Sequence, residues 1–136
     1  MPITDSRSPK SYLMLFRNGG PETIEHLSPA PRQELTQQWN AWYDGLAAEG
    51  KVKHGHPLKA QGRVISGPHG KTVVDGPYAE AQDAIAGYFY LTATDLDEAT
   101  AIAQHCPGLP YGMTVEVRPL ANMSPVLEGV CARLPQ

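Results

Sequence analysis

The chain has 136 residues, a net charge of −3 at pH 7, 41% hydrophobic residues and 18% charged residues. This length predicts one domain, because single domains typically contain about 100 to 200 residues. The composition is that of a globular chain rather than a disordered one. A negative net charge argues against a surface that follows nucleic-acid phosphates, which needs basic clusters.

Targeting signals and paired cysteines are not evident in the sequence. The first ten residues, MPITDSRSPK, are polar and lack the apolar core of a secretory signal. The best apolar run, Ala84 to Leu91, is far shorter than the roughly 20 residues that span a bilayer. Cys106 and Cys131 match no metal or redox spacing and are expected to be free thiols. These features predict a cytoplasmic protein.

The first half of the chain predicts a strand and a long amphipathic helix. Residues 11–17, SYLMLFR, are hydrophobic without a break from Tyr12 to Phe16, so we expect a strand with both faces covered. Ser28 can cap a helix whose first turn tolerates Pro29 and Pro31, and Gly50 is a natural stop. The helical stripe consists of Leu35, Trp39, Trp42, Tyr43 and Leu46. The two tryptophans could form a ligand platform, but a place in the core is favoured.

The middle of the chain predicts a hairpin followed by another strand. Extended runs at 62–66 and 71–74 flank the turn Gly-Pro-His-Gly at 67–70. Residues 87–93 then alternate, as expected of a strand with two different faces. One face carries Phe89, Leu91 and Ala93, and the other carries Tyr88, Tyr90 and Thr92.

The last part predicts a second helix and a final strand. Asp95 can cap the helix, with Glu98 at the partner position of a capping box. Its buried stripe is expected to be Leu96, Ala99, Ile102 and Ala103. Cys106-Pro107-Gly108 ends it, and a strand follows at 114–118. Val115 and Val117 lie on one face of that strand, and Thr114, Glu116 and Arg118 on the other.

The order strand, helix, hairpin, strand, helix, strand is typical of an α+β fold of the ferredoxin-like type, two β-α-β halves with an antiparallel sheet. Both helices would cover one face. The other face would carry Tyr88, Tyr90, Thr92, Glu116 and Arg118. A homodimer that packs these faces together would cover the aromatic rings and enclose a partly polar cavity. The predicted elements place the domain at residues 11–120, with a flexible arm at 1–10 before it and a C-terminal extension at 121–136 after it.

The segment VVDGPYAEAQDAIAGYFYLTATDLDEATAIAQHCP, residues 73–107, resembles the DGPF motif region of the YCII-related family. YLMLFR at the start and GMTVEVRPL at the end also fit, so the resemblance extends from Tyr12 to Leu120. It implies a dimeric α+β barrel with a small-molecule pocket. Many DGPF-type members accompany extracytoplasmic-function sigma factors, and a dehydrochlorinase among the wider relatives is proposed to use a His and an Asp. Gln82 stands where relatives often have lysine, and His54 and His56 are not inherited from the family pattern.

Asp75 begins the Asp-Gly-Pro-Tyr turn and has two interpretations. The structural one is an Asx-type hydrogen bond to its own backbone, which helps the chain reverse between two strands. The functional one is a general acid or base that projects into the dimer cavity. Tyr78 would either offer its hydroxyl to a ligand or anchor the turn against the core.

His54-x-His56 would place both rings on one side of an extended segment, a spacing that can bind a metal. No third ligand is evident, so solvated histidines or a proton-transfer partner for Asp75 are favoured instead. Glu116 and Arg118 would pair with each other across the dimer or bind an anionic substrate.

Motifs for nucleotides, zinc or a serine nucleophile are not found, so no metal and no cofactor are expected. The sequence favours a small-molecule protein whose cavity lies at the dimer interface and whose candidate catalytic residues are Asp75, His54 and His56. The candidate substrate-binding residues are Tyr78, Tyr88, Tyr90, Glu116 and Arg118. The alternative is a non-catalytic ligand-sensing or regulatory module associated with a sigma factor.

Overall fold

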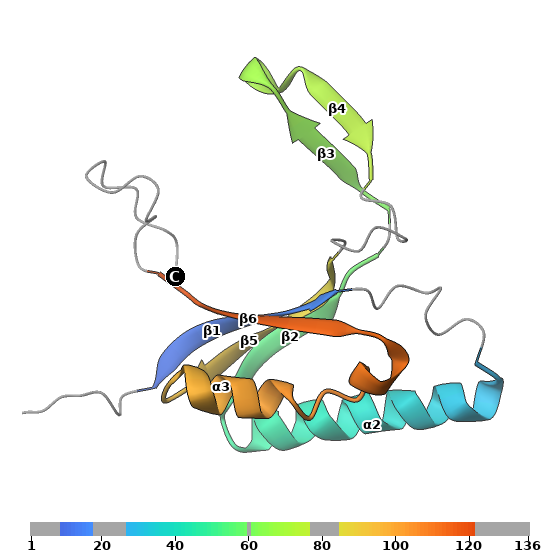
Figure 1. The fold of residues 1–136 in the computed structure, drawn as a ribbon, viewed down its shortest axis with the longest axis vertical. Coiled ribbons are helices and arrows are strands. Elements are labelled where there is room, and N and C mark those ends of the chain that lie inside the picture. The colour runs from blue at the N-terminus through green and yellow to red at the C-terminus, as the bar shows by residue number, and fades with distance from the viewer. Residues whose placement is uncertain (1–8, 18–26, 60, 77–84, 122–136) are drawn as a thin grey trace, which may run out of the picture.

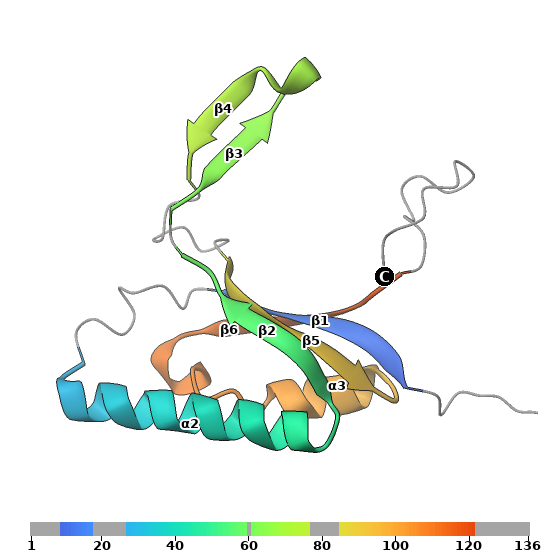
Figure 2. The same cartoon turned by 180° about the vertical axis from the view of Figure 1, so that it is seen from behind.

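The computed structural model describes residues 9–17, 27–59, 61–76 and 85–121. Four antiparallel strands form the main sheet in the order β2-β5-β1-β6. The elements of this layer and of the layer beneath it are β1 (Lys10–Arg17), α2 (Pro29–Ala48), β2 (Val52–Pro57), β5 (Ile85–Ala93), α3 (Leu96–Ala103) and β6 (Thr114–Pro119). Both helices cover the same face of the sheet, as Figures 1 and 2 show from opposite sides. The other face carries no helix of the described chain.

The chain order and strand order together are those of a ferredoxin-like fold, which confirms the α+β expectation. The sequence interpretation was wrong about which segment supplies the second strand of this fold. Residues 52–57 form that strand, at the edge of the sheet, whereas the predicted hairpin is a separate two-stranded sheet inserted before β5. The extended segment predicted at His54 and His56 was not identified as a strand of this sheet, because VKHGHP shows no apolar alternation.

The inserted hairpin consists of β3 (Arg63–Ser66) and β4 (Thr72–Asp75), joined through a 3-10 turn at Pro68–Gly70. It projects from the end of the sheet, away from the two helices (Figure 1). The predicted turn residues are confirmed. Gly67 and Gly70 have φ values of 85° and 67°, a conformation that glycine adopts without a steric cost.

The core lies between the sheet and the two helices. Alternate residues of β1 and β5 point into it, which confirms the predicted faces of residues 87–93. Met14 and Leu91 are fully buried at its centre. Phe16 packs edge-to-face against Trp39 and Phe89, with 4.9 Å between ring centroids in both pairs. The predicted core role of the α2 aromatic stripe is therefore confirmed.

The ends of α2 show one capping interaction that formed and one that did not. Gly50 has φ 75° and its N–H donates to Ala47 at 3.0 Å, while the Lys51 N–H donates to Leu46 at 2.9 Å. These two bonds form a Schellman motif, as a C-terminal glycine predicts. Ser28 occupies the N-cap, but its side chain makes no capping bond. Pro31 stands at the third helical position and has no N–H to donate.

Helix α3 begins with a capping arrangement that is displaced by one residue. Asp95 accepts from the Glu98 N–H at 2.8 Å, as predicted. Glu98 instead accepts from the backbone N–H of Thr94 at 2.7 Å, where a standard capping box would use that of Asp95. The hydrogen bond from the Thr94 N–H lowers the pKa of the Glu98 carboxyl. Partial burial raises this pKa, and the positive charge of Lys51 lowers it further. Leu96, predicted in the buried stripe, is 47% exposed at the first position of the helix.

Cys106 lies just beyond α3 and is buried, with its Sγ 3.8 Å from the Met113 Sδ. Burial raises the pKa of the Cys106 thiol, so the group stays protonated at neutral pH. Cys131 and nearly all of the predicted arm and C-terminal extension lie outside the described residues.

Candidate functional site

The face of the sheet that the helices leave open brings together six of the residues singled out from the sequence. Residues directly opposite each other in an antiparallel sheet share a face, so the register defines rows across it. The first row is His54, Tyr90, Leu13 and Arg118, and the second is His56, Tyr88, Leu15 and Glu116. We call these eight residues the open face. Its histidines and tyrosines lie at the β2 edge and its charges at the β6 edge.

Histidine and tyrosine side chains are in contact at the β2 edge of the open face. The Tyr88 hydroxyl lies 3.1 Å from Nδ1 of His54, and the imidazole tautomer determines which group donates. The His54 ring lies 5.1 Å from the Tyr90 ring, and Lys53 Nζ lies 5.3 Å from the same ring centroid. His56 is also close to Tyr88, with 6.1 Å between ring centroids. This cluster can both hydrogen bond to a ligand and stack against it.

The charged edge of the open face is paired within the chain. Glu116 lies 3.6 Å from Arg17 and 3.8 Å from Arg118. Arg118 is largely exposed, so its pairing with Glu116 contributes little to stability. Among the described residues, Nε of Arg17 and the hydroxyl of Thr92 are shielded from solvent and lack a hydrogen-bond partner. Arg17 and Thr92 lie in rows next to the open face, opposite Thr114 and Ser11, so unused polar groups flank it.

Asp75 lies apart from this cluster, at the end of β4. Its Oδ1 accepts a hydrogen bond from Nε of Arg63, its cross-strand partner, at 3.1 Å. The Asp75 side chain is 85% exposed, so this chain does not by itself provide the buried surroundings expected for a cavity acid. Within the described residues Asp75 makes no contact with His54 or His56. Tyr78, the other candidate on this turn, lies outside the described residues.

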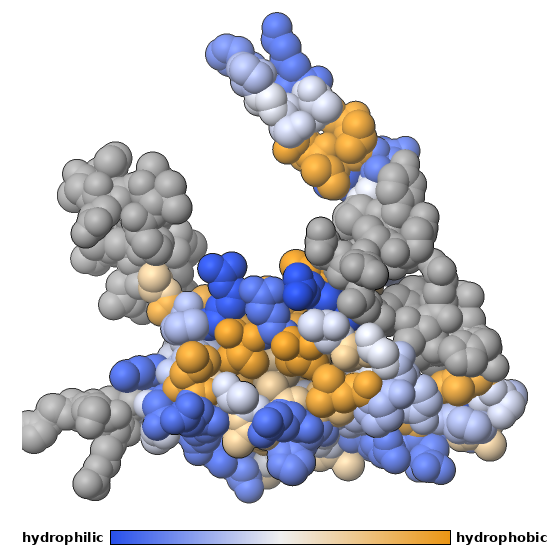
Figure 3. Space-filling model, viewed as in Figure 1, coloured by the Kyte–Doolittle hydropathy of each residue, from blue (hydrophilic) through white to orange (hydrophobic). Residues whose placement is uncertain are grey.

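The hairpin exposes apolar side chains on both of its faces. The pair Ile65 and Val73 lies on one face, and the pair Val64 and Val74 on the other. Ile65 is 62% exposed and the three valines are between 44% and 53% exposed. These residues form the hydrophobic cluster on the projecting hairpin in Figure 3. A strand pair that is apolar on both faces is typical of one covered on both sides.

A cavity that the sequence interpretation missed lies on the opposite, helix-covered side of the sheet. It has a volume of about 610 Å³, within the usual range for ligand pockets. We call it the α2 cavity. The described residues that line it are Phe16, Thr36, Trp39, Asn40, Tyr43, Gly55, His56, Pro57, Ala86, Gly87, Phe89 and Met113. The available sequence signal was Gly55 and Gly87, since glycine within a strand often marks a close approach of backbone or ligand.

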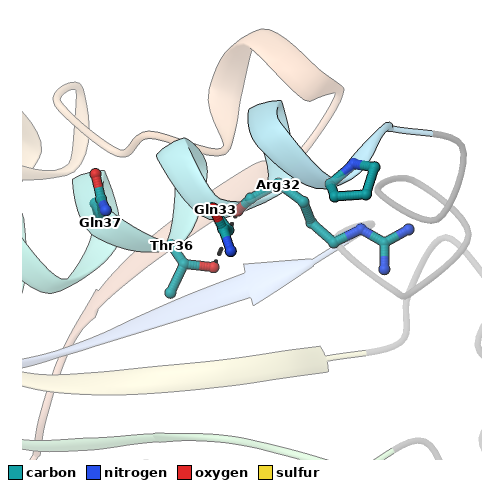
Figure 4. Close-up of a pocket in the computed structure, with 5 residues that line it drawn as sticks. Arg32, Gln33, Thr36 and Gln37 are labelled. Atoms are coloured by element: carbon teal, nitrogen blue, oxygen red, sulfur yellow. Dashed lines mark hydrogen bonds between the residues drawn. The ribbon is translucent and has the colours of Figure 1, made fainter.

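A second hollow, of about 520 Å³, lies beside the first turns of α2 (Figure 4). Its described lining is Pro29, Arg32, Gln33, Thr36 and Gln37, all from that one helix. Thr36 donates to the Arg32 carbonyl at 3.1 Å, and Arg32 donates to the Leu27 carbonyl at 3.3 Å. These side chains thus bond to nearby backbone, and groups from several elements do not converge here as in a catalytic site.

The fold and these sites define a small α+β protein with one sheet face covered by helices and the other open. The family model of the YCII-related domain matches residues 12–124, and the chain belongs to this family. No curated protein matches the sequence. In the described part of the chain, no three His, Cys, Asp or Glu side chains are grouped as a metal site would require. Neither described helix is long and apolar enough to cross a membrane.

Proposed function

We propose that this protein binds a small organic molecule on the open face, between two copies of the chain, and transfers a proton without a cofactor. The observation that carries the proposal is the 3.1 Å contact between His54 and Tyr88 on a sheet face that no described helix covers. Imidazole is the side chain whose charge changes most readily near neutral pH, and a phenol can donate or accept beside it.

A second copy of the chain is the proposed cover for the open face. Leu13 and Leu15 lie at its centre and are only half-buried. The hairpin of the same chain exposes four aliphatic side chains, and an isolated two-stranded hairpin is marginally stable in water. A two-fold symmetric dimer would cover both surfaces at once, because the same patch serves each partner. Cytoplasmic location is part of this proposal.

Within the proposed site, different edges of the open face have different roles. His54 and Tyr88 exchange the proton, and Tyr90 provides a ring against which the ligand stacks. Arg118, largely exposed beside Glu116, holds a negatively charged group of the ligand. Asp75 enters as an acid or base supplied by the hairpin of the second copy, which is consistent with its exposure in a single chain.

The test begins with a thermal-shift screen of small carboxylic acids, lactones and phenols against the full-length protein. Each compound that binds is then incubated with protein in D₂O, and the loss of its acidic C–H signal is followed by NMR. Proton transfer predicts deuterium incorporation that falls by about tenfold or more in Tyr88→Phe and His54→Gln, the scale typical of one acid–base group. His69→Gln, in the hairpin turn, is the matched control and should exchange normally.

Binding without chemistry is the second candidate, a ligand-sensing module of the kind that accompanies a sigma factor. One observation favours this candidate. The carboxylate of Asp75, the first residue of the family motif, pairs with Arg63 and not with the described histidines of its own chain. Compounds that stabilise the protein but never exchange protons would support this candidate. Equal exchange rates in wild type and Tyr88→Phe would refute the role of the His54–Tyr88 pair.

A further inference from the structure

Two glycines, one on β2 and one on β5, form part of the sheet-side lining of the α2 cavity. Gly55 pairs with Phe89 and Gly87 pairs with Pro57, so both glycines lie on the helix-covered face. A Cβ at Gly55 would lie 2.5 Å from the Phe89 ring, and one at Gly87 would lie 2.9 Å from the His56 carbonyl oxygen. The Phe89 ring therefore lies over bare backbone. No side chain rises from the sheet at these two positions to fill the space below α2.

The walls of the cavity are aromatic. Trp39 and Tyr43 descend from α2, where both are half-buried, and Phe16 and Phe89 rise from the sheet. Tyr43 meets Phe89 edge-to-face, with 5.2 Å between centroids, and Trp39 meets Phe16 in the same way at 4.9 Å. Rings held at such angles present both edges and faces to the cavity. A flat aromatic ligand could therefore make the same edge-to-face contacts that these rings make with one another.

The polar side chains that α2 contributes to the cavity, Thr36 and Asn40, are uncharged, and His56 of the lining belongs to a row of the open face. The described lining of the cavity contains no Lys, Arg, Asp or Glu. Asn40 supplies an amide that no described residue hydrogen bonds, and Thr36 retains acceptor capacity because its hydroxyl donates to its own helix. An ion would lose its hydration here without gaining a charged partner, whereas a neutral ring with one polar group would not.

We propose that the α2 cavity is a second binding site, specific for a neutral, planar aromatic molecule that carries a single hydrogen-bonding group. It lies across the sheet from the His54–Tyr88 pair, and it does not depend on that pair or on any proton transfer. His56 is the residue common to the cavity lining and the open face.

The test uses N-phenyl-1-naphthylamine, a neutral aromatic amine whose fluorescence rises when it leaves water and which absorbs tryptophan emission. Both tryptophans of the chain lie on α2, and Trp39 lines the cavity. The expected result is saturable binding at micromolar probe with strong quenching of tryptophan. Thr36→Phe fills the cavity from an exposed helix position and should weaken binding by about tenfold or more, equivalent to about 1.4 kcal/mol. Gln38→Phe adds the same ring to α2 outside the cavity lining and should bind as wild type.

A third variant separates the cavity from the exposed hairpin, which is the other apolar surface. Ile65→Thr reduces the hairpin patch and should leave probe binding unchanged. The proposal is overturned if wild type shows no saturable binding, if Thr36→Phe retains its helical circular dichroism and binds as tightly as wild type, or if only Ile65→Thr loses the probe. The readout is independent of turnover, so failure of the proposed function leaves this result interpretable.

Discussion

Replacing Gly87 by alanine should weaken the pairing between the edge strand β2 and the central strand β5. The added Cβ would lie 2.9 Å from the His56 carbonyl oxygen and 3.2 Å from the Pro57 Cα, both backbone atoms that can yield only if the strands move apart. Overpacking of this kind costs about 1–3 kcal/mol. Alanine loses less backbone entropy on folding than glycine does, and this difference offsets about 0.5–1 kcal/mol of the overpacking cost. The net expected loss is about 0–2.5 kcal/mol of unfolding free energy, centred at about 1.3 kcal/mol.

Urea denaturation followed by far-UV circular dichroism measures this change. For a slope of about 1–2 kcal/mol per molar urea, the midpoint should fall by roughly 1 M at an unchanged slope. Gly45→Ala is the matched control, because a Cβ at that position in α2 meets nothing within 4 Å. It should raise stability by about 0.5–1 kcal/mol, since alanine is the better helix former. A Gly87→Ala protein as stable as wild type would refute the β2–β5 register, in which Gly87 lies opposite Pro57.

Three further predictions concern the open face, the helix cap and the hairpin. Leu15→Lys places a charge at the centre of the open face and should convert the proposed dimer to monomer in sedimentation velocity; a wild-type monomer at micromolar concentration would refute the dimer itself. Glu98→Gln should destabilise the protein more at pH 7 than near pH 3. The pKa of Glu98 is lowered in the folded state, so the stabilisation by its carboxylate is present above the usual glutamate pKa and is lost as the pH falls through the folded pKa. An equal loss of unfolding free energy at both pH values in urea melts would contradict the charged cap at Thr94. Asp75→Asn should change the unfolding free energy by less than about 1 kcal/mol, because its pair with Arg63 is exposed, and should reduce ligand binding or exchange; full retention of both would exclude an acid–base role for Asp75.

Much of the fold was predictable because its signals are local. The alternation of Phe89, Leu91 and Ala93 with their neighbours identifies a strand from seven residues alone. The stop at Gly50 and the cap at Asp95 depend on backbone groups within a few positions of each residue. The family match over residues 12–124 agrees with the motif that begins at Val73. These features need no knowledge of what packs against the segment.

The strand identity of residues 52–57 was decided by long-range pairing with β5, because the segment has too few apolar residues to show a period of its own. The same pairing brings His54 to the hydroxyl of Tyr88, 34 residues further along the chain. Asp75 is a further case. Its turn motif allowed either a backbone-bonding turn residue or a cavity acid, and only the hairpin register shows its pairing with Arg63.

The sequence by itself indicated where the helices, the hairpin turn and the alternating strand lie, since these follow from side-chain periodicity and from capping within one turn of chain. The tertiary structure alone decided which face is open, what Asp75 pairs with, and that Gly55 and Gly87 lie together under α2. The physical reason is that a site is a set of distances between residues far apart in sequence. Sheet register fixes those distances, and one residue of slippage would turn every side chain of a strand to the other face.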